Sequence, residues 1–350
     1  MTMVVGSAVS RTTTKRLLHP ALIPVAGFLA GIAALALFLW LAGYDPAAGL
    51  SALWRGAFGS PYAIFSATLV RATPLLVLGL AFAVAARAGG LNIGMEGQFA
   101  VGTLAATWTG IGVASLPAVT AIPLVLGSGL AAGAAWMLVP VALRLRFGVT
   151  EVISTLLLNF VAEVVVSWAV TGPLQEAGRT YPQSDPIAAV ARLPRIMPSE
   201  RIHVGLALAV IMAVTLALIF RRTRIGFTLD ATGAGPAATQ IIGRVNVNRV
   251  VAGALLTSGA LAGLGGAMEV SGVTHALYQR ISPGFGFTAI AVALLARLGP
   301  LAIVLSAVLF GALEAGAGAM QRDAGIPAVA VQVVQAVVII AMVLGMRSRR

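Results

Sequence analysis

The run 89–102 holds an amide, a carboxylate and a second amide, Asn92, Glu96 and Gln98, in an otherwise apolar stretch of sequence. Because polar groups at membrane depth are costly, those that occur there usually face a protein interior or a water-filled path. Helical spacings of three and four residues would leave Gln98 pointing elsewhere and put four side chains on one stripe: Asn92, Glu96, Phe99 and Thr103. The run therefore predicts a pathway lining, with a protonated Glu96 bonded between helices as the alternative.

A second polar pattern repeats every fourth residue along the apolar segment 151–172. Its members are Glu151, Thr155, Asn159, Glu163 and Ser167. Four-residue steps drift by roughly 40° each on a helix of 3.6 residues per turn, so the stripe winds slowly around the helix. It predicts a wet cavity or a polar interface, with packing against another subunit as the alternative. We expect Thr155 and Asn159 to belong to the polar path.

The segment 282–288, Ser-Pro-Gly-Phe-Gly-Phe-Thr, predicts the start of a further helix. Ser282 is a favourable N-cap and Pro283 a favourable first helical residue. Phe285 and Phe287 would then form a stacking or closing surface, or else make ordinary lipid or core contacts.

Several kinds of chemistry lack their residues. The chain has no cysteine, and therefore no disulfide or thiolate chemistry. Its only lysine, Lys15, stands between Thr14 and Arg16 and cannot complete a phosphate-binding Gly-Lys-Ser/Thr motif. There is no His-Glu-x-x-His zinc motif. We expect no catalytic residue, no metal site and no cofactor in this chain.

The composition is that of an integral membrane protein. Charged residues make up 10% of the chain and hydrophobic residues 59%, whereas soluble domains contain about 25% charged residues. The long apolar runs favour helices over a membrane β-barrel, which alternates apolar and polar residues. The net charge of +12 lies between apolar segments, as topology signals do, and we therefore do not interpret it as nucleic-acid binding.

We predict an all-α, polytopic helical bundle of about ten spans, each needing about 20 apolar residues, with eight or nine as the alternative. The predicted spans are 21–43, 62–86, 91–110, 119–142, 151–172, 203–220, 250–270, 284–298, 300–319 and 328–346. Gly299-Pro300 would join two half-helices or two full spans. Four glycine pairs are spaced for close helix packing: Gly27/Gly31, Gly90/Gly94, Gly129/Gly133 and Gly259/Gly263.

The arginines predict the topology. With both termini inside, roughly twice as many basic residues lie inside as outside, which fits the positive-inside rule. Residues 1–20 and 347–350 are then cytoplasmic tails of a single transmembrane domain, 21–346. The proline-rich loop 173–202 lies outside and the arginine-bearing loop 221–249 inside. Within that inner loop, Pro236 can start a short helix and Gly243 can end it.

Four blocks resemble one family of transport proteins. Gly90-Leu-Asn-Ile-Gly-Met-Glu-Gly-Gln98 resembles the signature of bacterial ABC-importer permeases for nucleosides, within the wider branched-chain amino acid and ribose permease group. Glu151-Val-Ile-Ser-Thr-Leu-Leu-Leu-Asn159 is similar to that subgroup's next block. The outer-loop pieces Gly172-Pro173-Leu174 and Pro182-Gln183-Ser184, and the stretch 284–311, are similar too. The resemblance spans roughly residues 60–345.

The resemblance implies a larger machine. It would contain a second permease chain in a heterodimer, a cytoplasmic ATP-binding protein that uses ATP and Mg²⁺, and an external substrate-binding lipoprotein, all at the bacterial inner membrane. Residues 231–243 are similar to the segment that docks the ATPase, with matches at Ala231, Gly233, Pro236, Ala238 and Gly243. Asp230, Gly235 and Arg244 depart from that pattern.

We expect this chain to pass a nucleoside inward while the partner hydrolyses ATP. Ribose or another simple sugar is the alternative substrate, and a proton-coupled secondary transporter using Glu96, Glu163 or Glu314 is the alternative class. The expected path residues are Asn92, Glu96, Gln98, Thr155, Asn159, Phe285 and Phe287.

Overall fold

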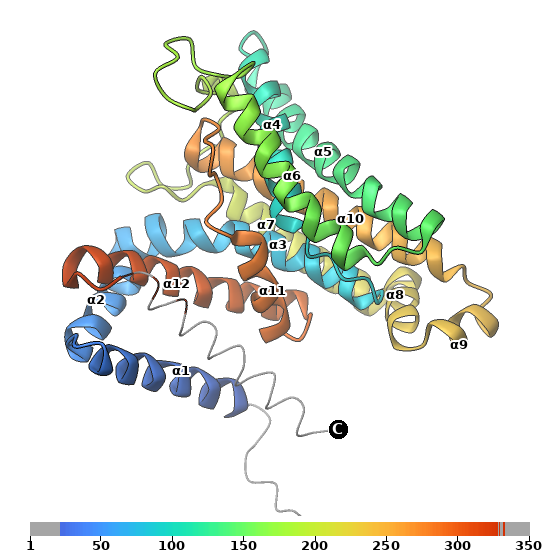
Figure 1. Ribbon diagram of the computed structural model, residues 1–350, viewed down its shortest axis with the longest axis horizontal. Coiled ribbons are helices and arrows are strands. Elements are labelled where there is room, and N and C mark those ends of the chain that lie inside the picture. The colour runs from blue at the N-terminus through green and yellow to red at the C-terminus, as the bar shows by residue number, and fades with distance from the viewer. Residues whose placement is uncertain (1–21, 328, 330–331, 333–350) are drawn as a thin grey trace, which may run out of the picture.

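The computed structural model describes residues 22–327, 329 and 332, and these form a bundle of helices (Figure 1). The described residues contain no β-strand; two isolated bridges, Gln183 with Tyr278 and Arg195 with His203, tie the loops. The helices are α1 (Leu22–Leu41), α2 (Pro46–Phe58), α3 (Leu69–Arg87), α4 (Met95–Gly112), α5 (Ala118–Phe147), α6 (Glu151–Thr171), α7 (Val204–Arg222), α8 (Arg224–Ala234), α9 (Pro236–Ile241), α10 (Val247–Glu269), α11 (Phe285–Leu295) and α12 (Pro300–Ala324). Three short turns of other helical type complete them: η1 (Ala63–Thr68), η2 (Ala189–Ala191) and η3 (Val270–Thr274).

Six helices in the described part of the chain are long and apolar enough to cross a membrane. They are 63–87, 118–147, 151–171, 204–222, 247–274 and 300–324, and they confirm six of the predicted spans. The predicted span 21–43 forms the 20-residue α1, and 91–110 forms α4, which begins only at Met95. The predicted span 328–346 and both predicted tails fall almost entirely outside the described residues.

The chain around Gly299-Pro300 joins one short helix to one long one. Helix α11 has 11 residues and α12 has 25, so the pair is neither two half-helices nor two full spans. An extended connector, residues 275–284, runs from the end of η3 to the start of α11 (Figure 1).

The amphipathic helix α2 was not predicted, because its 13 residues include Gly49, Ser51 and Arg55 and are too few for a span.

Helix α3 is the central element. From Pro74 to Ala86 it is apolar around its whole circumference, and helices of that kind are buried. Nearly all of its side chains from Val70 to Ala85 are buried, among residues of α7, α11 and α12. It therefore fixes the positions of the helices that carry the polar groups described below.

Two predicted glycine pairs form a close seam between α5 and α10. A Cβ on Gly133 would meet the carbonyl oxygen of Gly259, and a Cβ on Gly263 would meet the carbonyl oxygen of Gly129. Gly102 of α4 is equally close to the backbone of Gly263. Backbones that touch in this way are what small residues four apart allow in membranes. The Gly90/Gly94 pair, in contrast, lies in the turn before α4 and joins no two helices by that spacing.

The two long loops lie at opposite ends of α5 and α6 (Figure 1). At one end, α8 and α9 form a compact unit, and α9 begins at Pro236, as predicted, and ends at Ile241, two residues before Gly243. At the other end, the loop 173–202 folds over the bundle, where Ser66 donates to Glu200 and accepts the N–H of Arg201. The structure thus separates the coupling-like segment from the loop 173–202 by the full length of the bundle.

Candidate functional site

The turn before α4 is closed by its own amide side chains. The Oδ1 of Asn92 accepts the N–H of Gly94 at 3.0 Å, and its Nδ2 donates to Gln98 at 2.8 Å and to Ser258 at 2.9 Å. Gln98 donates back to Asn92 at 3.1 Å. Both amides are fully buried. Asn92 therefore precedes the helix rather than lying on its stripe, so that prediction was wrong. Gln98 points away from Glu96, as predicted, and toward Asn92 and Met137.

Asn159 of α6 caps the start of α4 from outside. Its Oδ1 accepts the N–H of Gly97 at 2.8 Å, and its Nδ2 donates to the carbonyl of Ile93 at 3.0 Å. The first N–H groups of a helix have no partner within it, so this amide supplies one. A Cβ on Gly97 would lie 3.0 Å from the Cα of Asn159. Glycine at 97 is thus what lets the two helices approach closely enough for the bond.

Glu96 plays the same part for α11. Its Oε2 accepts the N–H of Gly286, the second residue of α11, at 2.6 Å. A Cβ on Gly286 would collide with the backbone of Glu96. A carboxylate at a helix N-terminus also meets the positive end of the helix dipole. Glu96 therefore binds two segments that lie 190 residues apart in the chain.

The predicted start of α11 was placed too early. The N-cap is Gly284, with φ at +102°, and the helix begins at Phe285 rather than Pro283. Ser282 still serves the helix end, because its Oγ accepts the N–H groups of Gly284 at 3.1 Å and Phe285 at 3.0 Å.

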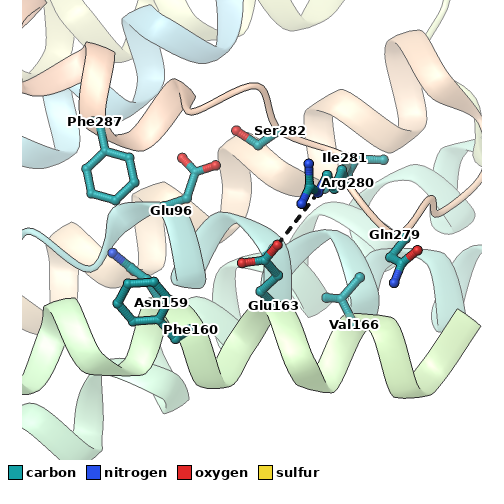
Figure 2. A pocket seen from close by; sticks show the side chains of 11 residues that line it. Glu96, Asn159, Phe160, Glu163, Val166, Gln279, Arg280, Ile281, Ser282 and Phe287 are labelled. Carbon is teal, nitrogen blue, oxygen red and sulfur yellow. Dashed lines mark ion pairs between the residues drawn. The ribbon is translucent and has the colours of Figure 1, made fainter.

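A cavity of about 260 Å³ opens beside Glu96, between α4, α6, the connector 275–284 and α11 (Figure 2). Figure 2 shows the side chains of Glu96 and Glu163 and the ring of Phe287 gathered around one space, with Asn159 and Phe160 on the adjoining helix. The lining residues are Glu96, Ala100, Asn159, Phe160, Glu163, Val166, Gln279, Arg280, Ile281, Ser282 and Phe287.

Charged groups stand at the edge of this cavity. Arg280 and Glu163 pair at 3.9 Å, with side chains 86% and 57% exposed. A pair this open contributes little to stability, so its two charges are free to meet other groups. Gln279 donates to Ser167 at 2.8 Å beside it. The predicted stripe on α6 thus forms both a cavity wall and a polar interface, within one chain.

The N-terminal part of the α6 stripe, Glu151 and Thr155, does not reach the cavity. Thr155 is buried, and its Oγ1 donates to the carbonyl of Glu151 at 2.6 Å. The carboxylate of Glu151 accepts the N–H of Leu91 at 3.1 Å and pairs with Arg144 at 2.5 Å. These bonds connect the turn before α4 to the start of α6 and, through Glu151, to the end of α5.

The two predicted phenylalanines lie in different environments. Phe285 is 6% exposed and packs edge-on against Phe99, with ring centroids 6.0 Å apart. Phe287 is 47% exposed and lines the cavity.

The sequence did not predict three further cavity residues, Phe160, Gln279 and Arg280. For Gln279 and Arg280 there was a usable signal, because they are polar residues between two apolar segments.

In the coupling-like segment, one helix is packed into the bundle and the other is exposed. Helix α8 buries Gly226, Leu229 and Thr232, whereas α9 buries none of its residues. Ile241 and Ile242 are 78% and 83% exposed. Of the five matched positions, Ala231 and Gly233 lie on α8, Pro236 and Ala238 on α9, and Gly243 just after it.

Residues 64–343 match the family described as "Branched-chain amino acid transport system / permease component". The chain belongs to this permease family. Among its relatives, the permease is 37% identical over 331 residues to the guanosine ABC transporter permease protein NupP of Bacillus subtilis, covering 93% of each chain. It is 34% identical over 335 residues to the nucleoside ABC transporter permease protein NupB of Lactococcus lactis, covering 93% of this chain and 90% of that one. It is also 34% identical over 330 residues to the glucose ABC transporter permease of Haloferax volcanii, covering 91% and 86%.

Family membership settles the class of protein. The permease is a membrane transport subunit of the ABC type, not an enzyme, and a multi-pass protein of the cytoplasmic membrane, as predicted. The proton-coupled secondary transporter, the alternative class, does not fit this family.

Proposed function

We propose that this permease passes nucleosides inward across the membrane as one subunit of an ATP-driven importer. One observation carries the proposal: the chain is similar over nearly its whole length to the guanosine and nucleoside permeases. The chemistry of the cavity beside Glu96 agrees with that substrate class.

The cavity offers a nucleoside both polar and aromatic contacts. After its two bonds to the protein, the amide of Asn159 still has one N–H and one lone pair for a ligand. Glu96 and Glu163 can accept from ribose hydroxyls or base N–H groups. The exposed ring of Phe287 can stack on a base, since aromatic rings favour offset stacking and every base has a π-face.

The seven predicted path residues divide into two groups in this proposal. Glu96, Asn159 and Phe287 contact the substrate, together with Phe160 and Glu163. The other four hold these residues in place: Asn92, Gln98, Thr155 and Phe285.

The proposed topology has both termini inside and ten crossings. The end of α3, helix α8 and the turn after α11 meet at Arg87, which supports placing all three on the inner side. The start of η1–α3 and the loop 173–202 meet at Ser66, which supports placing both outside. The connector 275–284 and α11 together then make one inward crossing. Residues 21–346 form the single permease domain.

The proposed partners are a second permease chain, a cytoplasmic ATP-binding protein and an external substrate-binding lipoprotein. The exposed isoleucines on and after α9 support a docking role for the segment 231–243. ATP and Mg²⁺ would be used on the partner, because this chain lacks a phosphate-binding loop.

The test is uptake into proteoliposomes that contain the permease with its partner subunits. We expect uptake of labelled guanosine that requires ATP on the side of the membrane that carries the ATP-binding protein. This uptake should continue when an ionophore collapses the proton gradient. Loss of uptake with the gradient, at constant ATP, would refute the proposal.

Glucose is the second candidate substrate, supported by the Haloferax relative. Competition decides between the two. Unlabelled guanosine or inosine should suppress uptake of labelled guanosine and glucose should not, whereas suppression by glucose alone would favour the sugar.

A further inference from the structure

We propose that α11 links the α8–α9 segment to the cavity, through a joint between Arg87 and Asp230. The proposal rests on the proposed function, because it explains how movement at the ATPase side reaches the substrate. Two contacts define the link: Glu96 holds one end of α11, and Arg87 holds the other.

Arg87 joins four elements at one point. It is the last residue of α3, and its Nε and Nη2 donate to the two carboxylate oxygens of Asp230 on α8, each at 2.6 Å. Its guanidinium lies 4.3 Å from the ring centre of Phe220 on α7. Its Nη1 donates to the carbonyl of Leu298, after α11, at 3.4 Å. A planar guanidinium with five donors suits such a junction, and a lysine would not make the same bonds.

Helix α8 connects α9 to Arg87, so a movement of α9 at the ATPase side would reach Arg87 through α8. The Oγ1 of Thr239 on α9 lies 2.8 Å from the carbonyl oxygen of Ala231 and 2.9 Å from that of Gly235, and its one proton, shared between them, holds α9 to α8. A Cβ on Gly233 would meet the carbonyl oxygen of Arg87, so α8 touches the end of α3 directly. A displacement of the exposed α9 would therefore displace Arg87 as well, because both links are direct contacts.

The turn after α11 is held in a costly conformation. Arg297 and Leu298 have φ values of +50° and +58°, a region that residues other than glycine rarely adopt and that persists only when the surroundings fix it. The bond from Arg87 to Leu298 is one such constraint. If Arg87 follows α8, this turn is released or tightened.

Helix α11 carries that change to the cavity. Its 11 residues make a rod of about 16 Å. At the far end, Gly286 bonds to Glu96, and Phe287 faces the cavity. A shift of the turn thus moves the Phe287 ring relative to Glu96 and Asn159.

The first test is a double-mutant cycle in the complete reconstituted transporter. Asp230→Asn and Arg87→Gln should each lower guanosine uptake per ATP hydrolysed by about tenfold, and the double variant should lose no more than either single one, because both break the same joint. In each variant the ATP-binding protein should still co-purify with the permease and hydrolyse ATP. If Arg87 and Asp230 only stabilised the fold, binding of the ATP-binding protein would be lost together with uptake. Arg146→Gln, an exposed arginine at the same end of the bundle, is the matched control and should leave the ratio unchanged.

The second test follows α11 directly. The chain has no cysteine, so Phe287→Cys supplies a single thiol whose labelling rate reports exposure at the cavity. We expect ATP to change that rate in the otherwise native transporter and in Arg146→Gln, but not in Asp230→Asn. An ATP-dependent change that survives Asp230→Asn, or losses that add in the cycle, would overturn the proposal. Absence of ATP-dependent uptake in the native transporter would instead refute the proposed function.

Discussion

Two sets of polar groups from one short run, 89–102, have opposite surroundings. Asn92 and Gln98 form a sealed network with Ser258, in which each amide satisfies the other. Glu96 bonds to α11 at the edge of an open cavity. Polar residue type alone therefore does not predict which of these side chains lines the cavity. What separates the sets is whether a neighbouring helix closes over them.

The sealed side is closed by backbone contact and the open side by side chains. At the seam of α4, α5 and α10, glycines bring backbones together and leave no room for solvent. At the cavity, α6 meets the connector 275–284 through side chains: the exposed pair Glu163 and Arg280, and the apolar cluster of Val166, Val170 and Leu277. The Glu163–Arg280 pair is exposed to solvent and contributes little to stability, so it is the weaker of these two kinds of contact.

The strongest way to break this contrast is to force the seam apart. Gly133→Val should destabilise the permease by about 1–3 kcal/mol or more, because the new side chain meets the backbone of Gly259, which has no room to move. Thermal unfolding in detergent measures the loss. Gly127→Ala on the same helix is the control, since nothing lies within 4 Å of its added methyl group. Equal stability of the two variants would contradict the seam.

Removing the sealed amide should affect stability and not transport. Asn92→Ala leaves Gln98, Ser258 and the Gly94 N–H without their partner, at a cost of about 1–3 kcal/mol. The KM for guanosine, measured on the folded fraction, should stay constant. The exposed Asn248 gives the matched control, Asn248→Ala. A raised KM at unchanged stability would make Asn92 a pathway residue after all.

Neutralising the open carboxylate should do the reverse. Glu96→Gln keeps an oxygen for the Gly286 N–H but loses the charge, so stability should change little and the KM for guanosine should rise about tenfold, the difference between a charged and a neutral hydrogen bond. Glu163→Gln, at the exposed rim, should have a smaller effect in the same uptake assay. An unchanged KM in Glu96→Gln would remove its carboxylate from substrate contact.

The two phenylalanines offer the finest comparison. Phe287→Leu should raise the KM about threefold through loss of stacking, with stability kept. Phe285→Leu should lower the unfolding temperature with the KM kept, because that ring packs in the core against Phe99. Uptake and unfolding curves on both variants measure the pair, and an exchange of the two phenotypes would contradict the assignment.

Much of the fold was predictable because apolar length controls it. Runs such as 62–86 and 151–172 match the helices 63–87 and 151–171 within two residues. The errors lie where length gives no signal. Helix α11 is short because Gly284 and the turn at 296–299 interrupt an apolar run, and α2 is too short for a membrane window.

The site was only partly predictable, because its bonds join distant segments. The helical stripe failed at Asn92 because α4 begins three residues later, after Gly94. No local pattern links Glu96 to Gly286 or Glu163 to Arg280. The stripe on α6 did identify Asn159 and Glu163 as neighbours, since both lie on one helix.

Thiol labelling of two positions tests the central claim, that substrate passes the cavity of Glu96 and not the network of Asn92. In the cysteine-free chain, Phe287→Cys and the nearly isosteric Ser258→Cys each place one thiol in one region. We predict that a water-soluble maleimide labels position 287, that guanosine slows this labelling, and that position 258 stays unlabelled with or without ATP. Labelling at position 258 that guanosine prevents, with position 287 inert, would contradict the account.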